Sequence, residues 1–448
     1  MAPIETAVRR ARDTTVVAAT FLRDLRAPYR SLERLCELRD ARLRTLVAYA
    51  AETVPYYRDL FASQGIDPDA IRTLADLERL PIIEKEEVQA DPERFRSSSV
   101  LGREAIPFRT SGSTGMPLLL YHDRRSLLAN LVWGERERTI EARLCGRRIR
   151  YLAVDIEWSK STSKHARAFY RSTTFIPFRP GRESIAVDTP IDAIVARINA
   201  LRPDVVRGYG TYLEMMFRTI ERRGLEFHVP KVIVYVSDLM SAEGRRFIES
   251  RFAVPVISRY SAVEAFKIGF TCEERGGFHL HEDLCPVRIV DRDGRVLPMG
   301  EQGEVVITNL VNHGTVLFNY RLGDVGVRSA EPCRCGRMLP LLAELQGRVG
   351  DFILRPGGRI VDSTEITAVV TSKEGVLRYQ LVQHEPERFE LRLQTATEED
   401  WSRVRGPIVA DLKALLGGSP HVEMVRRERI DPEPQAKFRR VFSLYDGR

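Results

Sequence analysis

The stretch VIVYVSDLMSAEGRRFIESRFAVPVISRYSAVE, residues 232–264, is the most informative part of the chain for its architecture. Its first five residues are apolar on both faces, as in a strand buried within a parallel sheet. Ser241 is suited to cap a helix that runs through Phe252, and Val254–Ser258 then forms the next strand. A strand, a helix and a second strand in this order are typical of a parallel α/β domain.

The same alternation extends towards the N-terminus of this stretch. Tyr151–Ile156 and Asp204–Val206 are short apolar runs of strand length. Between them, Thr189–Pro190 predicts a helix start, because a cap residue followed by proline is favoured in the first helical turn. Apolar residues three and four apart over Ile191–Leu201 mark one buried helical face, and the spacing over Leu213–Gly224 predicts another helix.

The C-terminal hundred residues have a different pattern. They predict strands at Gln380–Gln383 and Phe389–Gln394 and a helix over Asp400–Leu416, whereas the first hundred residues of the chain are charged and helical. We therefore predict an α/β protein with a large N-terminal domain, residues 1–346, in which parallel or mixed sheets are flanked by helices. A small, mobile α+β domain, residues 347–448, completes the chain.

The composition excludes several protein classes. The 448 residues are 43% hydrophobic and 29% charged, which is typical of globular chains and not of disordered or fibrous ones. The net charge is +7, but acidic residues are interspersed with the basic ones, so no basic cluster predicts nucleic-acid binding. No apolar run reaches the roughly 18 residues that a membrane helix needs. Six cysteines are too few and too unevenly placed for a secreted disulfide framework, so we expect a cytoplasmic protein.

A loop rich in serine, threonine and glycine occupies residues 110–117. Backbone N–H groups and short hydroxyls in such a loop are suited to bind phosphate oxygens. The Gly-Lys-Ser/Thr ending of a Walker loop is absent, and similar residues also occur in ordinary turns. The candidate phosphate-binding residues are Ser111, Gly112, Ser113, Thr114 and Gly115.

Three further motifs follow this loop. They are Tyr260–Glu264 after a strand, Tyr320–Asp324 after a glycine-containing strand, and Gly347–Arg348. With the loop, and in this order, they resemble the adenylate-forming ligases, which include acyl-CoA synthetases, peptide-synthetase adenylation domains and luciferases. The resemblance runs from about Pro55 to Lys437, nearly the whole chain. Each motif alone is common in proteins, but the whole set in this order along the chain is specific to the superfamily.

Within this superfamily the chain resembles the phenylacetate–CoA ligase branch. Pro55–Arg58, Gly65–Asp67 and Leu80–Lys85 look like the amino-terminal signature of that branch, and Gly303–Leu310 and Cys335–Arg337 look like parts of its later one. The chain also departs from the family pattern at four positions. Met116 stands where a lysine is usual, and Asn319 stands where an arginine is usual. Gly350 replaces an acidic hinge residue, and Ala436 replaces a glycine.

The resemblance implies roles for individual residues in ATP binding. Tyr260 would stack on the adenine, with Ser237 and Asp238 on the other side of the base, and Ser261 would belong to the same site. Asp324 would accept hydrogen bonds from both ribose hydroxyls, as a carboxylate can with its two oxygens. Without the other motifs, Tyr260 would be read as a core aromatic and Asp324 as a turn-capping residue.

The resemblance also implies three catalytic residues. Glu264, a hard oxygen ligand, would hold Mg²⁺ against the phosphates. Arg348 would add positive charge near the ribose and the α-phosphate. Lys437 would reach the negative charge that builds on the phosphoryl oxygens during attack on the α-phosphate. The alternative for Lys437 is a solvated tail residue, because Arg439 and Arg440 follow it closely.

The cysteines and histidines give a second, independent signal. Six residues separate Cys272 from His279, and Cys333 and Cys335 lie further along the chain. Three sulfurs and one imidazole match the closed tetrahedral ligand set of a structural Zn²⁺. His281 competes as the fourth ligand, and the resemblance favours His279. The alternative is a group of reduced thiols that pack without a metal.

We therefore expect an AMP-forming carboxylate ligase that converts a carboxylic acid into an acyl-adenylate with ATP and transfers the acyl group to coenzyme A. An amide ligase with an amine acceptor shares every motif. An arginine-rich, zinc-containing binding protein without catalysis would require clustered basic and aromatic residues, which the sequence lacks. The resemblance implies an aromatic acid, for which Tyr209 is either a pocket wall or a loop aromatic packed on the core. We expect small-molecule partners, no nucleic-acid or membrane partner, and a homodimer.

Overall fold

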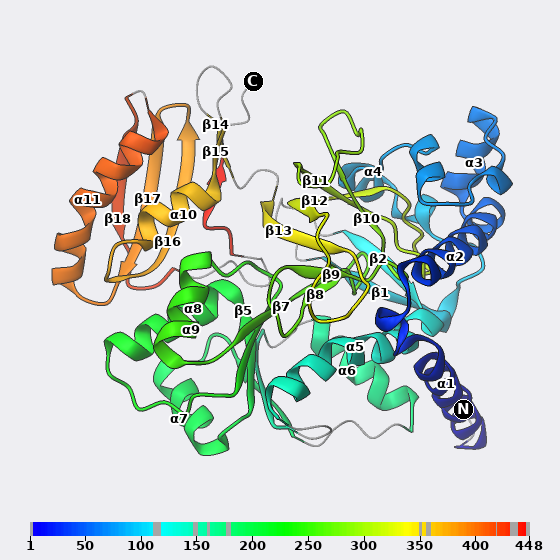
Figure 1. The fold of residues 1–448 in the computed structure, drawn as a ribbon, viewed down its shortest axis with the longest axis horizontal. Helices are drawn as coiled ribbons and strands as arrows, with labels where there is room; N and C mark the ends of the chain where they lie inside the picture. Colours follow the sequence, from blue (N-terminus) through cyan, green and yellow to red (C-terminus); the bar gives the residue numbers. More distant parts are fainter. Residues whose placement is uncertain are drawn as a thin grey trace. The chain divides into compact units, whose positions relative to one another are not determined.

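A computed structural model describes most of the chain (Figure 1). The described residues are 3–110, 118–146, 151–158, 162–175, 181–348, 352–354, 360–417, 419–430 and 438–444. They divide into two compact units. The first unit comprises Met1–Tyr151, Trp158–Arg182 and Ile257–Leu345, and the second comprises Leu152–Glu157, Glu183–Val256 and Gln346–Arg448. The chain enters the second unit for the last time at Gln346, next to the predicted domain boundary, and that two-domain division stays a prediction.

The N-terminal part of the first unit is largely helical, as the sequence predicts. Its α-helices are α1 (Pro3–Asp24), α2 (Leu32–Thr53), α3 (Pro55–Gln64) and α4 (Lys85–Ala90). Short 3₁₀ turns connect them at Ala27–Tyr29, Pro68–Ala70, Ala75–Arg79, Pro92–Phe95 and Gly102–Glu104. Among the described residues, no helix is both long and apolar enough to span a bilayer.

The first unit also contains a largely antiparallel sheet. Its strands run in the order β10 (Val287–Val290), β11 (Gln302–Ile307), β12 (Tyr320–Ser329), β13 (Leu341–Arg348), β9 (Phe278–Leu280), β8 (Gly269–Thr271) and β7 (Val256–Tyr260). A separate hairpin pairs β1 (Ala105–Arg109) with β2 (Leu119–Asp123). Helix α5 (Arg124–Leu144) follows the hairpin and packs against α1, and α6 (Thr162–Thr173) lies nearby (Figure 1).

The second unit contains the predicted parallel α/β arrangement. Its strands run in the order β6 (Val232–Val236), β5 (Val205–Tyr209), β3 (Ala153–Glu157) and β4 (Arg182–Ala186), and β6, β5 and β3 are parallel. Helix α7 (Ile191–Leu201) connects β4 to β5, α8 (Gly210–Arg222) connects β5 to β6, and α9 (Ala242–Phe252) follows β6. Ser241 caps α9 as predicted, because its Oγ accepts a hydrogen bond from the N–H of Gly244 at 2.8 Å.

Two local predictions in this region need correction. Helix α7 has Pro190 at its N-cap without a side-chain hydrogen bond, so Thr189 does not cap it. The strand after α9 is Val256–Tyr260 and begins two residues later than predicted. The reason is that Ala253 adopts a left-handed conformation (φ 51°) at the helix end, and the turn therefore takes up extra residues.

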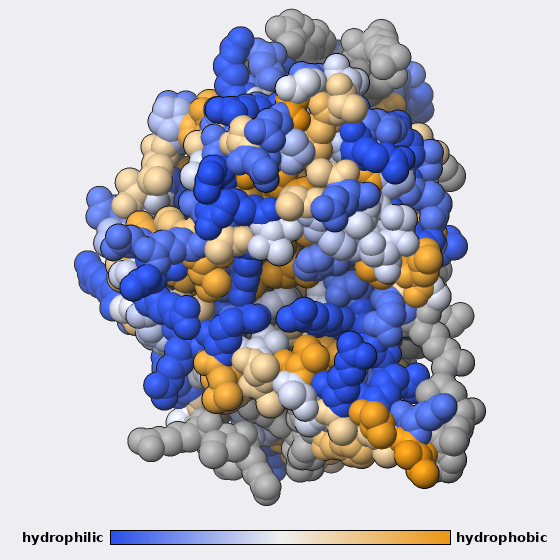
Figure 2. Space-filling model, turned by 90° about the vertical axis from the view of Figure 1, so that its right-hand side faces the viewer, coloured by the Kyte–Doolittle hydropathy of each residue, from blue (hydrophilic) through white to orange (hydrophobic). Residues whose placement is uncertain are grey.

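The C-terminal part of the second unit is an α+β arrangement. Its strands and helices are β14 (Phe352–Leu354), β15 (Ile360–Asp362), α10 (Ser363–Thr371), β16 (Val376–Glu385), β17 (Arg388–Thr395), α11 (Glu398–Leu416), β18 (His421–Arg426) and β19 (Val441–Ser443). The sheet order is β18-β17-β16-β19. Within the same unit, Arg440 donates a hydrogen bond at 2.5 Å to Glu214 on α8, and Glu214 is buried. On the face shown in Figure 2, hydrophilic side chains predominate and hydrophobic ones are scattered.

Candidate active site

The first unit brings together two of the predicted nucleotide-binding residues. Tyr260 ends β7, Asp324 lies on β12, and the Tyr260 hydroxyl donates a hydrogen bond to Asp324 Oδ2 at 2.7 Å. The Tyr260 ring is buried and lies edge-on to Phe278, whereas Asp324 is half-buried. The two residues are thus neighbours in space, and their contacts with ATP stay a prediction.

Glu264 stands out because its buried carboxylate lacks a partner. It lies in the loop that follows β7, and only 9% of the residue is exposed. Within the described part of the chain, its carboxylate makes no hydrogen bond or ion pair, and its oxygens keep some contact with solvent. A carboxylate without a protein partner is available to a hard cation such as Mg²⁺, which prefers oxygen ligands. Ser261, three residues earlier, is half-buried in the same loop.

The second unit contains Tyr209, Ser237 and Asp238. Asp238 accepts hydrogen bonds from the Gly210 N–H and, at 2.5 Å, from the Thr211 hydroxyl, so it caps the start of α8. Burial raises the pKa of the Asp238 carboxyl, although the Thr211 hydrogen bond acts in the opposite direction. Tyr209 is the residue directly before α8 and is half-buried, and Ser237 is exposed with a left-handed backbone (φ 74°).

Glycine is required at position 210 because the chain segments approach closely there. A Cβ on Gly210 would lie 2.5 Å from the backbone nitrogen of Met240. The segment that carries Ser237 and Asp238 is thereby held against the residue that follows Tyr209. Sequence reasoning did not identify Thr211 or Gly210 as partners of Asp238, because Gly210 and Thr211 begin helix α8 whereas Asp238 follows β6, further along the chain.

Several predicted site residues fall outside the described part of the chain. Lys437 and the side chain of Arg348 are among them, although the backbone of Arg348 ends β13. Three of the positions at which the sequence departs from the family pattern also lie outside the described part, namely Met116, Gly350 and Ala436. The remaining residues outside the described part are the predicted phosphate-binding residues Ser111, Gly112, Ser113, Thr114 and Gly115.

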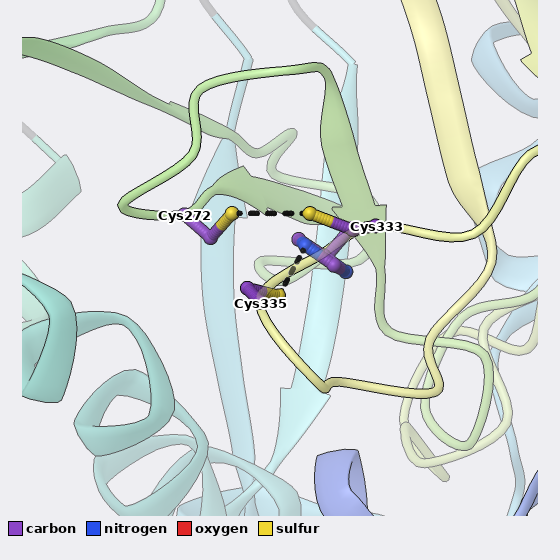
Figure 3. Close-up of side chains that lie close together, drawn as sticks. Cys272, Cys333 and Cys335 are labelled. Carbon is purple, nitrogen blue, oxygen red and sulfur yellow. Dashed lines mark hydrogen bonds between the residues drawn. The ribbon is translucent and has the colours of Figure 1, made fainter.

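The four predicted zinc ligands do come together, and Figure 3 shows the three cysteines among them. Cys272 follows β8, His279 lies in β9, and Cys333 and Cys335 lie between β12 and β13. Their ligand atoms all lie within 4.8 Å of one another; the sulfurs of Cys272 and Cys333 are 3.6 Å apart, and Cys335 Sγ is 3.3 Å from His279 Nε2. Tetrahedral zinc, with bonds of about 2.3 Å to sulfur, separates two sulfurs by about 3.8 Å. The donor set therefore fits Zn²⁺.

His281, the competing ligand, is not part of this cluster. It is fully buried, its Nε2 lies 3.5 Å from Glu137 Oε1, and its Nδ1 lies 3.4 Å from Arg136 Nη1. Burial also lowers the pKa of His279 to about 4 and raises that of Cys272 to about 12. A bound cation would favour the thiolate of Cys272, which burial alone disfavours.

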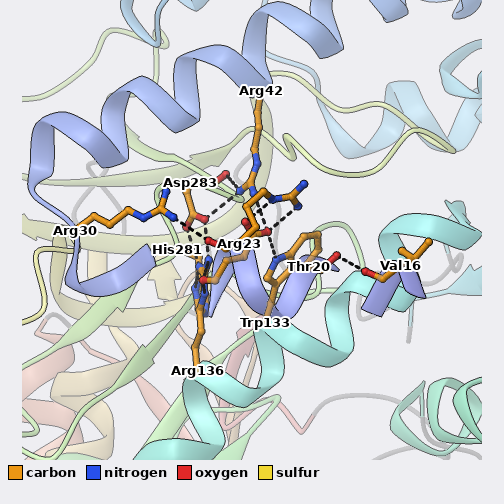
Figure 4. Close-up of polar contacts among 10 residues, drawn as sticks. Val16, Thr20, Arg23, Arg30, Arg42, Trp133, Arg136, His281 and Asp283 are labelled. Atoms are coloured by element: carbon orange, nitrogen blue, oxygen red, sulfur yellow. Dashed lines mark hydrogen bonds and ion pairs between the residues drawn. The ribbon is translucent and has the colours of Figure 1, made fainter. Parts of the chain in front are cut away.

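A buried ionic network lies close to His281 (Figure 4). Arg136 on α5 donates two hydrogen bonds to Asp283, at 2.8 and 2.9 Å, and Arg42 on α2 donates a third at 3.0 Å. Arg42 also contacts Asp24, at the end of α1, at 2.8 Å. Burial alone would raise the pKa of Asp283, but the two arginines hold it well below its usual range. The network ties three helices to the loop after β9.

The chain is similar to known CoA ligases in sequence and in fold. No protein-family model matches the chain. It is 26% identical to the phenylacetate–coenzyme A ligase of Thermus thermophilus over 409 residues, which cover 89% of each chain, and 24% identical to that of Escherichia coli, with 92% and 96% covered. Its fold matches a crystal structure of 2-hydroxyisobutyryl-CoA ligase in complex with an acyl-AMP, with a TM-score of 0.73, 20% identity and coverage of 93% and 91%. The chain is thus similar in sequence to phenylacetate–coenzyme A ligases over about nine-tenths of its length, and its fold resembles that of 2-hydroxyisobutyryl-CoA ligase.

Proposed function

We propose that the protein is an AMP-forming ligase that activates a carboxylic acid as its acyl-adenylate and transfers the acyl group to coenzyme A. The observation that carries the proposal is the similarity to phenylacetate–coenzyme A ligases over about nine-tenths of the chain. The contact between Tyr260 and Asp324 and the unpartnered carboxylate of Glu264 support it. An aromatic acid is the proposed substrate class, with Tyr209 as a residue of its binding site.

In the first half-reaction, a carboxylate oxygen of the acid attacks the α-phosphorus of ATP and pyrophosphate leaves. Tyr260 would bind the adenine together with Ser237, Asp238 and Ser261, and Asp324 would accept hydrogen bonds from the ribose hydroxyls. Glu264 would hold Mg²⁺, which supplies charge neutralisation on the triphosphate. The loop at residues 111–115 would bind phosphate oxygens through its N–H groups.

Two basic residues would act on the charge that develops during this step. Arg348 and Lys437 would stabilise the negative phosphoryl oxygens as the acid attacks. In the second half-reaction the thiol sulfur of coenzyme A attacks the acyl carbon, and AMP leaves. The thiol proton is released in this step, so the products are the thioester, AMP and H⁺.

The test is ATP–pyrophosphate exchange across a library of acids. We expect exchange that depends on both the acid and Mg²⁺, and AMP release that accelerates with coenzyme A and not with amines. AMP release accelerated only by amines would instead support the amide ligase. Absence of exchange with every acid would contradict an adenylating function.

We also propose that Cys272, His279, Cys333 and Cys335 hold one structural Zn²⁺. The fit of the four donor atoms supports this assignment. Metal analysis of the purified protein should find about one equivalent of zinc, because a closed set of four protein ligands binds one ion. The double variant Cys333→Ser/Cys335→Ser should lose the metal, whereas Cys145→Ser, a buried cysteine outside the cluster, should retain it. A metal-free wild-type protein would refute the site. A cytoplasmic location and a homodimer stay predictions.

A further inference from the structure

The loop that carries Glu264 is anchored at several nearby positions by side chains from elsewhere in the first unit. His122 Nε2, on β2, lies 2.8 Å from the Val263 carbonyl oxygen. Asn309 Nδ2, just after β11, donates a hydrogen bond at 2.8 Å to the Glu264 carbonyl oxygen. Both anchoring side chains are almost completely buried, with 2% of His122 and 1% of Asn309 exposed. Such contacts fix the backbone of the loop rather than the Glu264 side chain.

The two anchoring contacts act on the two peptide groups that flank the Glu264 Cα. The Val263 carbonyl belongs to the peptide group before Glu264, and the Glu264 carbonyl belongs to the one after it. Peptide groups are planar, so their orientations set the two backbone dihedrals of Glu264. Those dihedrals determine where the side chain leaves the backbone.

Each anchoring side chain has a defined orientation. A carbonyl oxygen accepts hydrogen bonds and does not donate them, so the His122 Nε2 must carry the hydrogen. Burial lowers the pKa of His122 to about 4, and the ring is therefore neutral near pH 7. Asn309 Oδ1 accepts hydrogen bonds from the Val311 and Asn312 N–H groups, both at 3.1 Å, which directs its Nδ2 towards Glu264.

The backbone conformation after Glu264 is also unusual. Phe266 is a bulky residue in the left-handed region, with φ of 58°, and its N–H donates a hydrogen bond to Ala262 O at 2.6 Å. Its ring packs on His122, with the ring centroids 4.2 Å apart. Such strained conformations persist only where the surroundings enforce them, and they cluster at functional sites. His122 therefore contacts the loop both before and after Glu264.

We propose that His122 and Asn309 are positioning residues that hold the Glu264 carboxylate in one orientation towards the metal–triphosphate complex. This inference rests on the proposed role of Glu264. Because that carboxylate has no partner within the described part of the chain, its orientation comes from the backbone and not from hydrogen bonds to the side chain. A mobile carboxylate would have to be ordered when the complex binds. The conformational entropy lost in that ordering would make the binding weaker.

The test uses three variants of the full-length protein. His122→Phe keeps an aromatic ring against Phe266 but removes the donor, and His122→Gln retains a donor near the position of Nε2. Tyr170→Phe is the matched control, because it removes a buried hydroxyl that accepts a hydrogen bond from Asn130, in the hydrophobic cluster against which Phe266 packs. The measurements are the affinity for Mg·ATP without acid, by calorimetry, and hydrogen exchange of the loop amides, residues 262–267.

We expect His122→Phe to weaken Mg·ATP binding by about 10-fold and to accelerate amide exchange in the loop, because small errors in positioning are known to have effects of this size or larger. His122→Gln should stay within about 3-fold of the wild type, and Tyr170→Phe should not change the affinity. Asn309→Asp keeps the acceptor used by Val311 and Asn312 but loses the donor, so it should reproduce the effect if His122→Phe does not fold.

A double-mutant cycle separates positioning from general destabilisation. If His122 acts through Glu264, His122→Phe should have no further effect on Mg·ATP affinity in a Glu264→Gln background. An equal 10-fold loss in both backgrounds, or no loss in either, would overturn the inference while leaving acid-dependent exchange of the wild type intact. A wild-type protein without such exchange would instead contradict the proposed function and, with it, this inference.

Discussion

Two buried carboxylates of the first unit have opposite surroundings. Asp283 is completely buried, and its oxygens accept three hydrogen bonds from Arg136 and Arg42 (Figure 4). Glu264 is nearly as buried but has no partner among the described residues. Removal of the Asp283 carboxylate would leave a buried arginine without its charged partner, whereas the Glu264 carboxylate is available to a ligand that the protein does not itself supply. The two sites should therefore respond oppositely to the same chemical change.

The largest expected effect is on stability, from Asp283→Asn. This change leaves the buried Arg136 without its charged partner, and breaking a buried ion pair typically lowers the free energy of unfolding by about 3–5 kcal/mol. Chemical denaturation measures the loss. The matched control is Asp293→Asn, which removes an exposed ion pair with Arg295 and should change the free energy by less than about 0.5 kcal/mol. Equal stability of the two variants would mean that the network contributes nothing.

Glu264→Gln should show the reverse behaviour. Without the carboxylate that would hold Mg²⁺, the rate of acid-dependent pyrophosphate exchange should fall by about 10² or more, the scale of removing one electrostatic element from an active site. The free energy of unfolding should stay nearly the same, because the variant breaks no side-chain hydrogen bond or ion pair within the described part of the chain. Exchange assays and denaturation on the same preparation measure both effects. A near-normal exchange rate would contradict the proposed role of Glu264. A loss of stability like that of Asp283→Asn would contradict the expected difference between the two carboxylates.

The sequence was sufficient to predict the elements and residues that leave a local pattern. The cap at Ser241 and the helix to Phe252 follow from neighbouring residues, and the structure confirms both. The Cys/His spacing predicted a cluster that the structure brings together. Tyr260 and Asp324 were found as separate motifs through the resemblance, and their contact depends on the register of distant strands.

Contacts between distant segments could not be predicted in the same way. His122 and Val263 are 141 positions apart, and Asn309 and Glu264 are 45 apart, so no spacing connects either pair. Each contact joins a side chain to a backbone carbonyl, which every residue has, so the partner has no compositional signature. The pairing of Arg136 with Asp283 is equally hidden, because 69 basic and 62 acidic residues allow very many pairings. The three-dimensional fold selects one of them.

The smallest expected effect is the dependence of stability on pH, and it separates His122 from the carboxylates. Burial lowers the pKa of His122 from 6.5 to about 4, so between these values the unfolded chain binds a proton that the folded protein does not. The free energy of unfolding should therefore fall as the pH drops from about 6.5 towards 4, by up to about 1.4 kcal/mol per pH unit for this histidine. The pKa of Asp283 is lowered instead, so its contribution is present above about pH 4 and is lost only below it.

His122→Gln isolates this contribution from that of the other buried histidines. Burial also lowers the pKa of His279 to about 4 and that of His281, so the wild-type curve contains several protons. Denaturation at pH 7, 6 and 5 gives the slope of the free energy of unfolding against pH for the wild type and for His122→Gln. The two slopes should differ by the equivalent of up to one proton taken up on unfolding. Because a uniform packing defect would shift the curve without changing its slope, parallel curves would show that His122 does not titrate in this range. A slope difference would establish that the ring which contacts the Glu264 loop is neutral at neutral pH, as its hydrogen bond to the Val263 carbonyl requires.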